Sequence, residues 1–135
     1  MEVLGSWPGM WGTHAATYLR TLVIATTLVF ALPLLCFPIG WARLFGWRIP
    51  ERTDLAVYFG RCLGAFVLVF EVFLWRASAG HDTALAFGLL LGISGMMTLV
   101  HAWGALRRIQ PPLEPLEIFF YAGLFVLTLL FWPRA

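Results

Sequence analysis

Four long apolar stretches limit the fold of this chain more than any other feature. They cover residues 18–38, 54–76, 83–106 and 114–132, and short connections separate them. A helix that crosses a bilayer needs about 20 mainly apolar residues. Continuous apolar runs without period-two alternation favour helices over the strands of a membrane barrel. We therefore predict an all-α integral membrane protein, a four-helix bundle with short connections in one domain over 1–135.

The composition supports a chain surrounded by lipid. It is 61% hydrophobic and 12% charged, whereas soluble domains have roughly 45–50% apolar and about 25% charged residues. The mean hydropathy is +0.85. A net charge of +2 without a basic run gives no reason to expect a nucleic-acid partner. Cys36 and Cys62 lie far apart in apolar segments and are interpreted as buried thiols.

The distribution of arginines predicts the orientation in the membrane. The first and third connections carry Arg43, Arg48, Arg52, Arg107 and Arg108, and the opposite side carries Arg20, Arg76 and Arg134. Basic residues concentrate on the cytoplasmic side, and tryptophans concentrate at both interfaces, where the expected helix ends carry them. We predict a multi-pass protein of the bacterial cytoplasmic membrane with both termini external.

Several polar side chains are expected at a similar depth below the cytoplasmic side. Counting residues from the helix ends places Arg61, His101 and Glu117 roughly 5–10 Å into the membrane. Tyr58 and Tyr121 are close to them along their helices. Ionisable groups within spans usually face the bundle interior, where they pair or carry a function. We predict a polar cluster of these five residues in which Arg61 pairs with Glu117.

Two further patterns lie in the apolar segments. Arg20 and Glu71 are expected at similar depth near the external side, which predicts a second charge pair. Gly88, Gly92 and Gly95 form a small-residue strip within 83–106. Such strips allow helices to approach closely, either within one chain or between subunits.

Cofactors are not specified by these residues. His101 and Glu117 supply fewer ligands than a metal site usually has, so no metal site is predicted. His14 and His81 lie on the opposite side of the membrane from His101, which argues against a haem held by two histidines. His101 is interpreted either as a hydrogen-bonded structural residue or as a proton carrier. No soluble-enzyme motif is present.

Two patches resemble the DoxX-like family of small membrane proteins. They are WARLFGWRIPERTD at 41–54 and YFGRCLGAFVLVFE at 58–71, in which RLFGW and GRCLG carry the detail. The resemblance implies a four-helix bundle. Some members of that family are linked to redox partners or larger membrane assemblies, but no cysteine motif here supports a redox role.

Three functions fit these patterns. We predict a small non-enzymatic membrane protein, an accessory or scaffold subunit with a membrane-protein partner or a second copy of itself. The alternative is a binder of a lipophilic molecule, or an acid–base enzyme acting on one, such as a quinone, sterol or isoprenoid. That function would use Arg61, His101 and Glu117. A transporter built on Glu71 is the third function.

Overall fold

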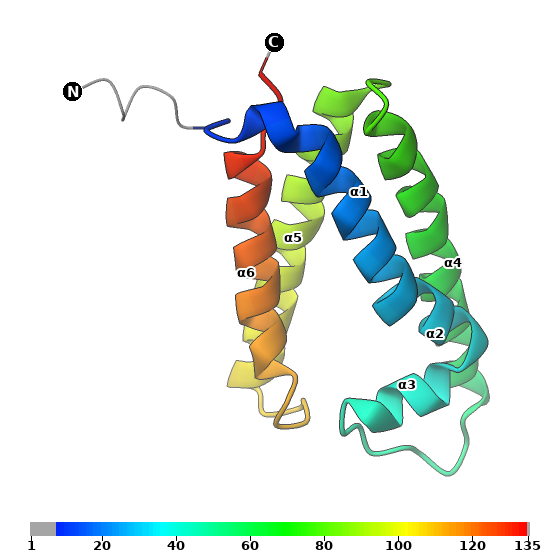
Figure 1. The fold of residues 1–135 in the computed structure, drawn as a ribbon. Coiled ribbons are helices and arrows are strands. Elements are labelled where there is room, and N and C mark those ends of the chain that lie inside the picture. The colour runs from blue at the N-terminus through cyan, green and yellow to red at the C-terminus, as the bar shows by residue number, and fades with distance from the viewer. Residues whose placement is uncertain (1–7, 135) are drawn as a thin grey trace.

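The computed structural model describes residues 8–134, and the regular structure of this part is entirely helical. The elements are η2 (Gly12–His14), α1 (Ala15–Thr26), η3 (Thr27–Ala31), α2 (Leu32–Cys36), α3 (Pro38–Leu44), α4 (Asp54–Ala77), α5 (Thr83–Leu106) and α6 (Pro115–Leu130). Figure 1 shows that α1, η3 and α2 form one long rod, and that the short α3 lies across the end away from the termini. The all-α prediction is confirmed for the described residues.

Three helical segments are long and apolar enough to cross a membrane, namely Gly12–Cys36, Asp54–Ala77 and Thr83–Leu106. Their length and composition support a membrane protein. The apolar α6 has 16 residues, or about 24 Å of helix, against a hydrocarbon core of about 30 Å. The predicted ranges 54–76 and 83–106 agree with α4 and α5 to within one residue.

The first span, predicted over 18–38 with Pro33 and Pro38 ending or kinking it, widens into the π-helical η3 before Pro33 and ends at Cys36, the residue before Phe37. Pro33 has no N–H to donate to the carbonyl of Val29, four residues earlier, and its ring crowds that carbonyl. Trp41 of α3 supplies a donor, since its Nε1 lies 2.8 Å from Val29 O. This bond ties α3 to the first rod.

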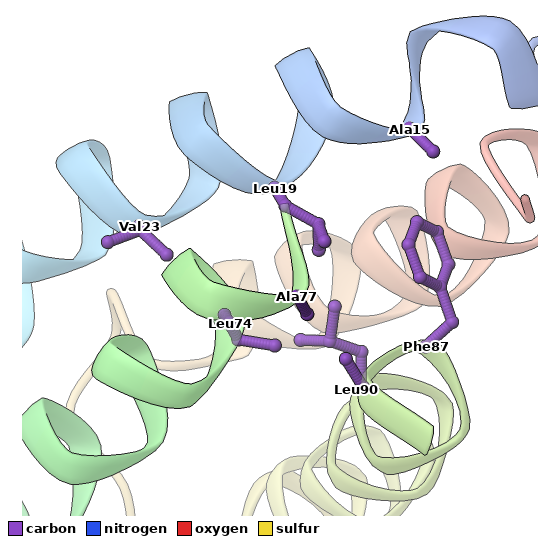
Figure 2. Close-up of a cluster of buried hydrophobic side chains, with 8 residues drawn as sticks. Ala15, Leu19, Val23, Leu74, Ala77, Phe87 and Leu90 are labelled. Atoms are coloured by element: carbon purple, nitrogen blue, oxygen red, sulfur yellow. The ribbon is translucent and has the colours of Figure 1, made fainter. Parts of the chain in front are cut away.

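The long helices associate as two pairs. One pair is α5 with α6, and the other is the first rod with α4. Near the end that carries the termini, the pairs share an apolar core of Ala15, Leu19, Val23, Leu74, Ala77, Ala86, Phe87 and Leu90. Figure 2 shows side chains of α1, α4 and α5 converging there. Toward the other end the pairs diverge (Figure 1), so the shared apolar packing is concentrated at one end.

Two glycines of α4 allow this helix to pack closely against the segments beside it. A Cβ on Gly64 would lie 2.6 Å from the backbone nitrogen of Leu35 and 2.8 Å from the carbonyl oxygen of Ala31. A Cβ on Gly60 would lie 2.6 Å from Cβ of Pro38. The GxxxG pattern within GRCLG therefore lets α4 approach the first rod and the start of α3 closely.

The glycine strip predicted for close packing on α5 does not have that role inside the described chain. A Cβ on Gly88 or Gly92 would meet no atom within 4 Å, and both residues are exposed. A Cβ on Gly95 would make only ordinary contact, 3.6 Å, with the ring of Phe125. Close approach between long segments occurs instead at Gly60 and Gly64 of α4.

The two described ends of the chain lie side by side (Figure 1). The backbone N–H groups of Gly9 and Trp11 donate to the carbonyls of Leu129 and Leu130, both at 2.9 Å. Arg134 Nε donates to Gly9 O at 2.6 Å. The last carbonyls of a helix have no partner within it, so the N-terminal segment satisfies two of those at the end of α6.

Candidate functional site

A buried histidine forms the centre of the candidate site. His101 lies near the end of α5, and 8% of its side chain is exposed. Its Nδ1 is 2.8 Å from the carbonyl oxygen of Met97, one turn earlier on the same helix. A carbonyl oxygen can only accept, so Nδ1 carries a proton and donates it to this bond. Nε2 is then the ring atom that faces the neighbouring helix.

Two carboxylates reach Nε2 from the beginning of α6. Glu117 Oε2 lies 2.8 Å from Nε2, and Glu114 Oε2 lies 3.4 Å from it. Glu114 immediately precedes α6 and Glu117 is in its first turn, where the free N–H groups and the helix dipole favour negative charge. Three residues of separation place the two side chains on one side of the helix. They are 5% and 12% exposed, so the cluster is largely shielded from its surroundings.

The connection after α3 holds one of these carboxylates in place. The N–H of Gly46 donates to Arg43 O and the N–H of Trp47 donates to Ala42 O, both at 3.0 Å. These two bonds form a Schellman motif, and they require the left-handed φ of +81° that Gly46 adopts. The motif directs Trp47 toward α6, where its Nε1 donates to Glu114 Oε1 at 2.7 Å.

The charges within this cluster are not balanced by its own residues. If Nε2 carries no proton, its lone pair faces two carboxylates, and the buried group holds two negative charges. The second oxygen of Glu117, Oε1, is buried without a hydrogen-bond partner. Over residues 8–134, His101 is the basic side chain paired with these carboxylates. Since buried unpaired charge is costly, the cluster should hold extra protons or a cation.

A cavity of about 390 Å³ opens beside the cluster, between the two helix pairs. Most of its wall is apolar, with Phe30 and Leu34 from the first rod, Trp41 from α3 and Leu63 from α4. His101, Glu114 and Glu117 are part of the same wall. Tyr121 completes this side, with its ring centre 5.1 Å from that of His101. The volume falls within the range of small-molecule sites in proteins, about 300–1,000 Å³.

The structure brings together three of the five residues predicted to form the polar cluster. His101, Glu117 and Tyr121 meet, but Tyr58 and Arg61 lie exposed on α4. The predicted ion pair between Arg61 and Glu117 is therefore not formed. The reason is helix rotation: Gly60 faces Pro38 of α3, and the next residue is turned by about 100° toward the surface.

The second predicted pair, Arg20 with Glu71, is not formed either. Arg20 Nε donates to Ser78 Oγ at 3.2 Å, and its guanidinium lies 6.0 Å from the ring centre of Trp75. The buried Glu71 accepts from Thr27 Oγ1 at 2.6 Å. The two helices are antiparallel, so Arg20 lies level with Ser78, and Glu71 lies level with Thr27. Each of these contacts is seven residues from the predicted partner, so Arg20 and Glu71 differ in depth by about 10 Å.

Two residues of the site were not among those predicted from the sequence. Glu114 stands three residues before Glu117, and Pro115 between them marks the first position of a helix. This spacing indicates that both carboxylates lie on one side of the helix, although Glu114 was not included in the predicted cluster. Trp47 comes from a different connection, and nothing in its local sequence indicates contact with α6.

The fold and site define a helical membrane protein with a buried histidine–dicarboxylate cluster beside an apolar cavity. No family model, no curated protein and no solved structure matches the chain. The DoxX-like resemblance stays a prediction that rests on the two quoted patches, and the function has to be argued from the site.

Proposed function

We propose that this chain is an integral membrane protein that binds a lipophilic molecule bearing a polar head group. The observation that carries the proposal is the apolar cavity with His101, Glu114 and Glu117 on one wall. Quinones, sterols and isoprenoid alcohols match this cavity, because each combines an apolar body with an oxygen-bearing head group. Binding sites of this kind combine an apolar wall with a few polar groups that fix orientation.

In this proposal α6 is the fourth membrane crossing, and the helices form the four-helix bundle predicted from the sequence. The bonds between Gly9 and the end of α6 support it, since an even number of crossings returns the chain to the side on which it began. The 16 residues of α6 match the membrane if the bilayer thins locally or the flanking residues reach its interface. The external placement of the termini remains a prediction from the arginine distribution.

The cluster gives the bound head group both donors and acceptors. The contact of 2.8 Å between His101 Nε2 and Glu117 Oε2 is short enough for a shared proton. A carbonyl oxygen of the bound molecule would accept a hydrogen bond from that proton, and a hydroxyl group would donate to the carboxylate. This arrangement supports binding, and it also supplies the pair of groups that acid–base chemistry on such a molecule requires. The role once predicted for Arg61 has no support from its exposed position.

The test measures ligand binding through the change in tryptophan fluorescence, because Trp41 and Trp47 line the cavity. Decylubiquinone, cholesterol and farnesol are titrated separately into the protein in detergent. We expect saturable quenching or enhancement by at least one of them. Ala42→Phe places a ring in the cavity and should weaken that binding at least tenfold. The matched control is Ala65→Phe, on an exposed position of α4. Equal affinity in the two variants would contradict the proposal.

A second candidate is the accessory-subunit role predicted from the sequence. The specific observation that favours it is the exposed pair Gly88 and Gly92 on α5, where an added Cβ would meet no atom of the described residues within 4 Å. A helix of a second copy could approach closely there. Chemical crosslinking in native membranes tests this: Gly92→Leu should abolish a crosslinked dimer that Gly123→Leu, another open glycine position, leaves intact.

A further inference from the structure

We propose that His101, Glu114 and Glu117 form a binding site for a first-row divalent metal ion, of the Zn²⁺, Mn²⁺ or Fe²⁺ class. The prediction of no metal site rested on two available ligands, and the fold supplies a third. Each residue offers one ligand atom, and the three atoms lie within 4.8 Å of one another. This inference rests on the cluster alone and does not need a molecule in the cavity.

The hydrogen bond made by the other side of the histidine ring supports a metal ligand. A histidine that binds a metal usually donates its second ring N–H to a carbonyl or carboxylate, which fixes the tautomer. His101 does this through Nδ1, 2.8 Å from Met97 O. Nε2 is thereby left to bind with its lone pair, and it points at both carboxylates.

Two of the three separations between ligand atoms suit a metal site, and the third, between the two carboxylates, is within 4.8 Å. Ligand atoms about 2.0–2.2 Å from one ion are separated from one another by roughly 2.8–3.6 Å in octahedral or tetrahedral geometry. The 3.4 Å between Nε2 and Glu114 Oε2 is within that range. The 2.8 Å between Nε2 and Glu117 Oε2 lies at the lower, octahedral end of that range.

The charge of the two carboxylates and the unpaired oxygen of Glu117 also favour a metal ion. A divalent ion balances the two carboxylates without any extra proton. It also gives a partner to Glu117 Oε1, the buried oxygen that has none, because a carboxylate can bind a metal through both oxygens. Glu114 is oriented from behind by Trp47 Nε1 at 2.7 Å, the kind of outer contact that fixes metal ligands. Three protein ligands leave a coordination position open beside the cavity.

The test is direct metal uptake by the purified protein. The full chain is prepared in detergent with an affinity tag free of histidine, treated with EDTA, and titrated separately with ZnCl₂ and MnCl₂. Bound metal is measured by mass spectrometry of the eluted protein after gel filtration. CoCl₂ provides a visible absorption spectrum that reports coordination by nitrogen and oxygen. We expect one ion per chain and a metal-dependent rise in Tm.

Conservative variants keep the test interpretable. Glu114→Gln keeps an oxygen that can accept from Trp47, and Glu117→Gln keeps the size of the side chain. Each should weaken binding at least tenfold and alter the cobalt spectrum. Glu71→Gln, at a buried carboxylate elsewhere, and His81→Ala, at an exposed histidine, should bind like the wild type.

Two results would overturn the metal site. One is the absence of stoichiometric uptake by the wild type, which would leave the cluster as a proton-sharing group. The other is unchanged uptake in both glutamine variants. Neither result bears on the fluorescence titration with lipophilic ligands, so the metal site and the proposed function succeed or fail separately.

Discussion

Trp47 Nε1 donates a hydrogen bond of 2.7 Å to Glu114 Oε1, and this bond links the connection after α3 to the beginning of α6. The two segments belong to different helix pairs, at the end where those pairs diverge. Trp47→Phe removes the donor and leaves a buried carboxylate oxygen without it. We expect the free energy of unfolding to fall by about 1–2 kcal/mol, measured by thermal unfolding in detergent with circular dichroism.

The control for this variant is Trp103→Phe, which makes the same change at an exposed position. It should alter stability by less than about 0.5 kcal/mol. Equal losses in the two variants would mean that the bond of Trp47 to Glu114 does not help to hold the pairs together.

Gly64 and Gly92 should respond oppositely to the same substitution. Gly64→Ala places a Cβ against the backbone of Leu35 and Ala31, neither of which can move aside as a flexible side chain could. The helices must separate, and overpacking of this kind costs about 1–3 kcal/mol. Gly92→Ala enters open space and should be neutral or slightly stabilising, since alanine favours helix more than glycine does. Urea- or heat-induced unfolding in detergent distinguishes the two, and a larger loss for Gly92→Ala would refute this account of the packing.

Thr27 should contribute to stability through Glu71. Its hydroxyl donates to the buried carboxylate at 2.6 Å, so Thr27→Val should cost about 1–3 kcal/mol. Thr26→Val is the control, because Thr26 bonds only to carbonyls of its own helix. In the background Glu71→Leu the cost of Thr27→Val should nearly vanish. Simple additivity in this double-mutant cycle would remove the claimed interaction.

The contribution of Trp41 to stability should depend on the presence of Pro33. Trp41→Phe removes the donor to Val29 O and is expected to cost about 1 kcal/mol. In the background Pro33→Ala, the N–H of residue 33 can donate to the same carbonyl, so the tryptophan bond becomes partly redundant. We expect a smaller loss there, measured by the same thermal unfolding. An equal loss in both backgrounds would show that Trp41 acts only through packing.

The parts of the fold predicted from sequence are those set by length and hydropathy. The α4 and α5 ranges agree closely with prediction, because each is one continuous apolar run bounded by polar residues. The π-helical turn within the first span was not predicted, and Val29 in that turn accepts a hydrogen bond from Trp41 of α3. That partner is a tertiary contact, which an apolar run does not reveal.

In the candidate site, the depth of a residue could be predicted from the sequence, but the side of the helix that it occupies could not. Depth follows from counting residues, so His101 and Glu117 were correctly placed at one level. Rotation about the helix axis follows from packing, and Arg61 faces outward because Gly60 and Gly64 take the inner face of α4. The polarity of a side chain alone therefore identified candidates but could not decide which of them meet.

The placement of the shared apolar core at the terminal end has a mechanical consequence. The pairs are held together by core residues such as Leu19 and Phe87 at one end, and by few bonds such as that of Trp47 to Glu114 at the other. If one pair rotated slightly about this core, the cavity end would widen while most of the shared apolar packing stayed in place. A hydrophobic molecule of the kind proposed above would then enter at that end, beside the bond of Trp47 to Glu114.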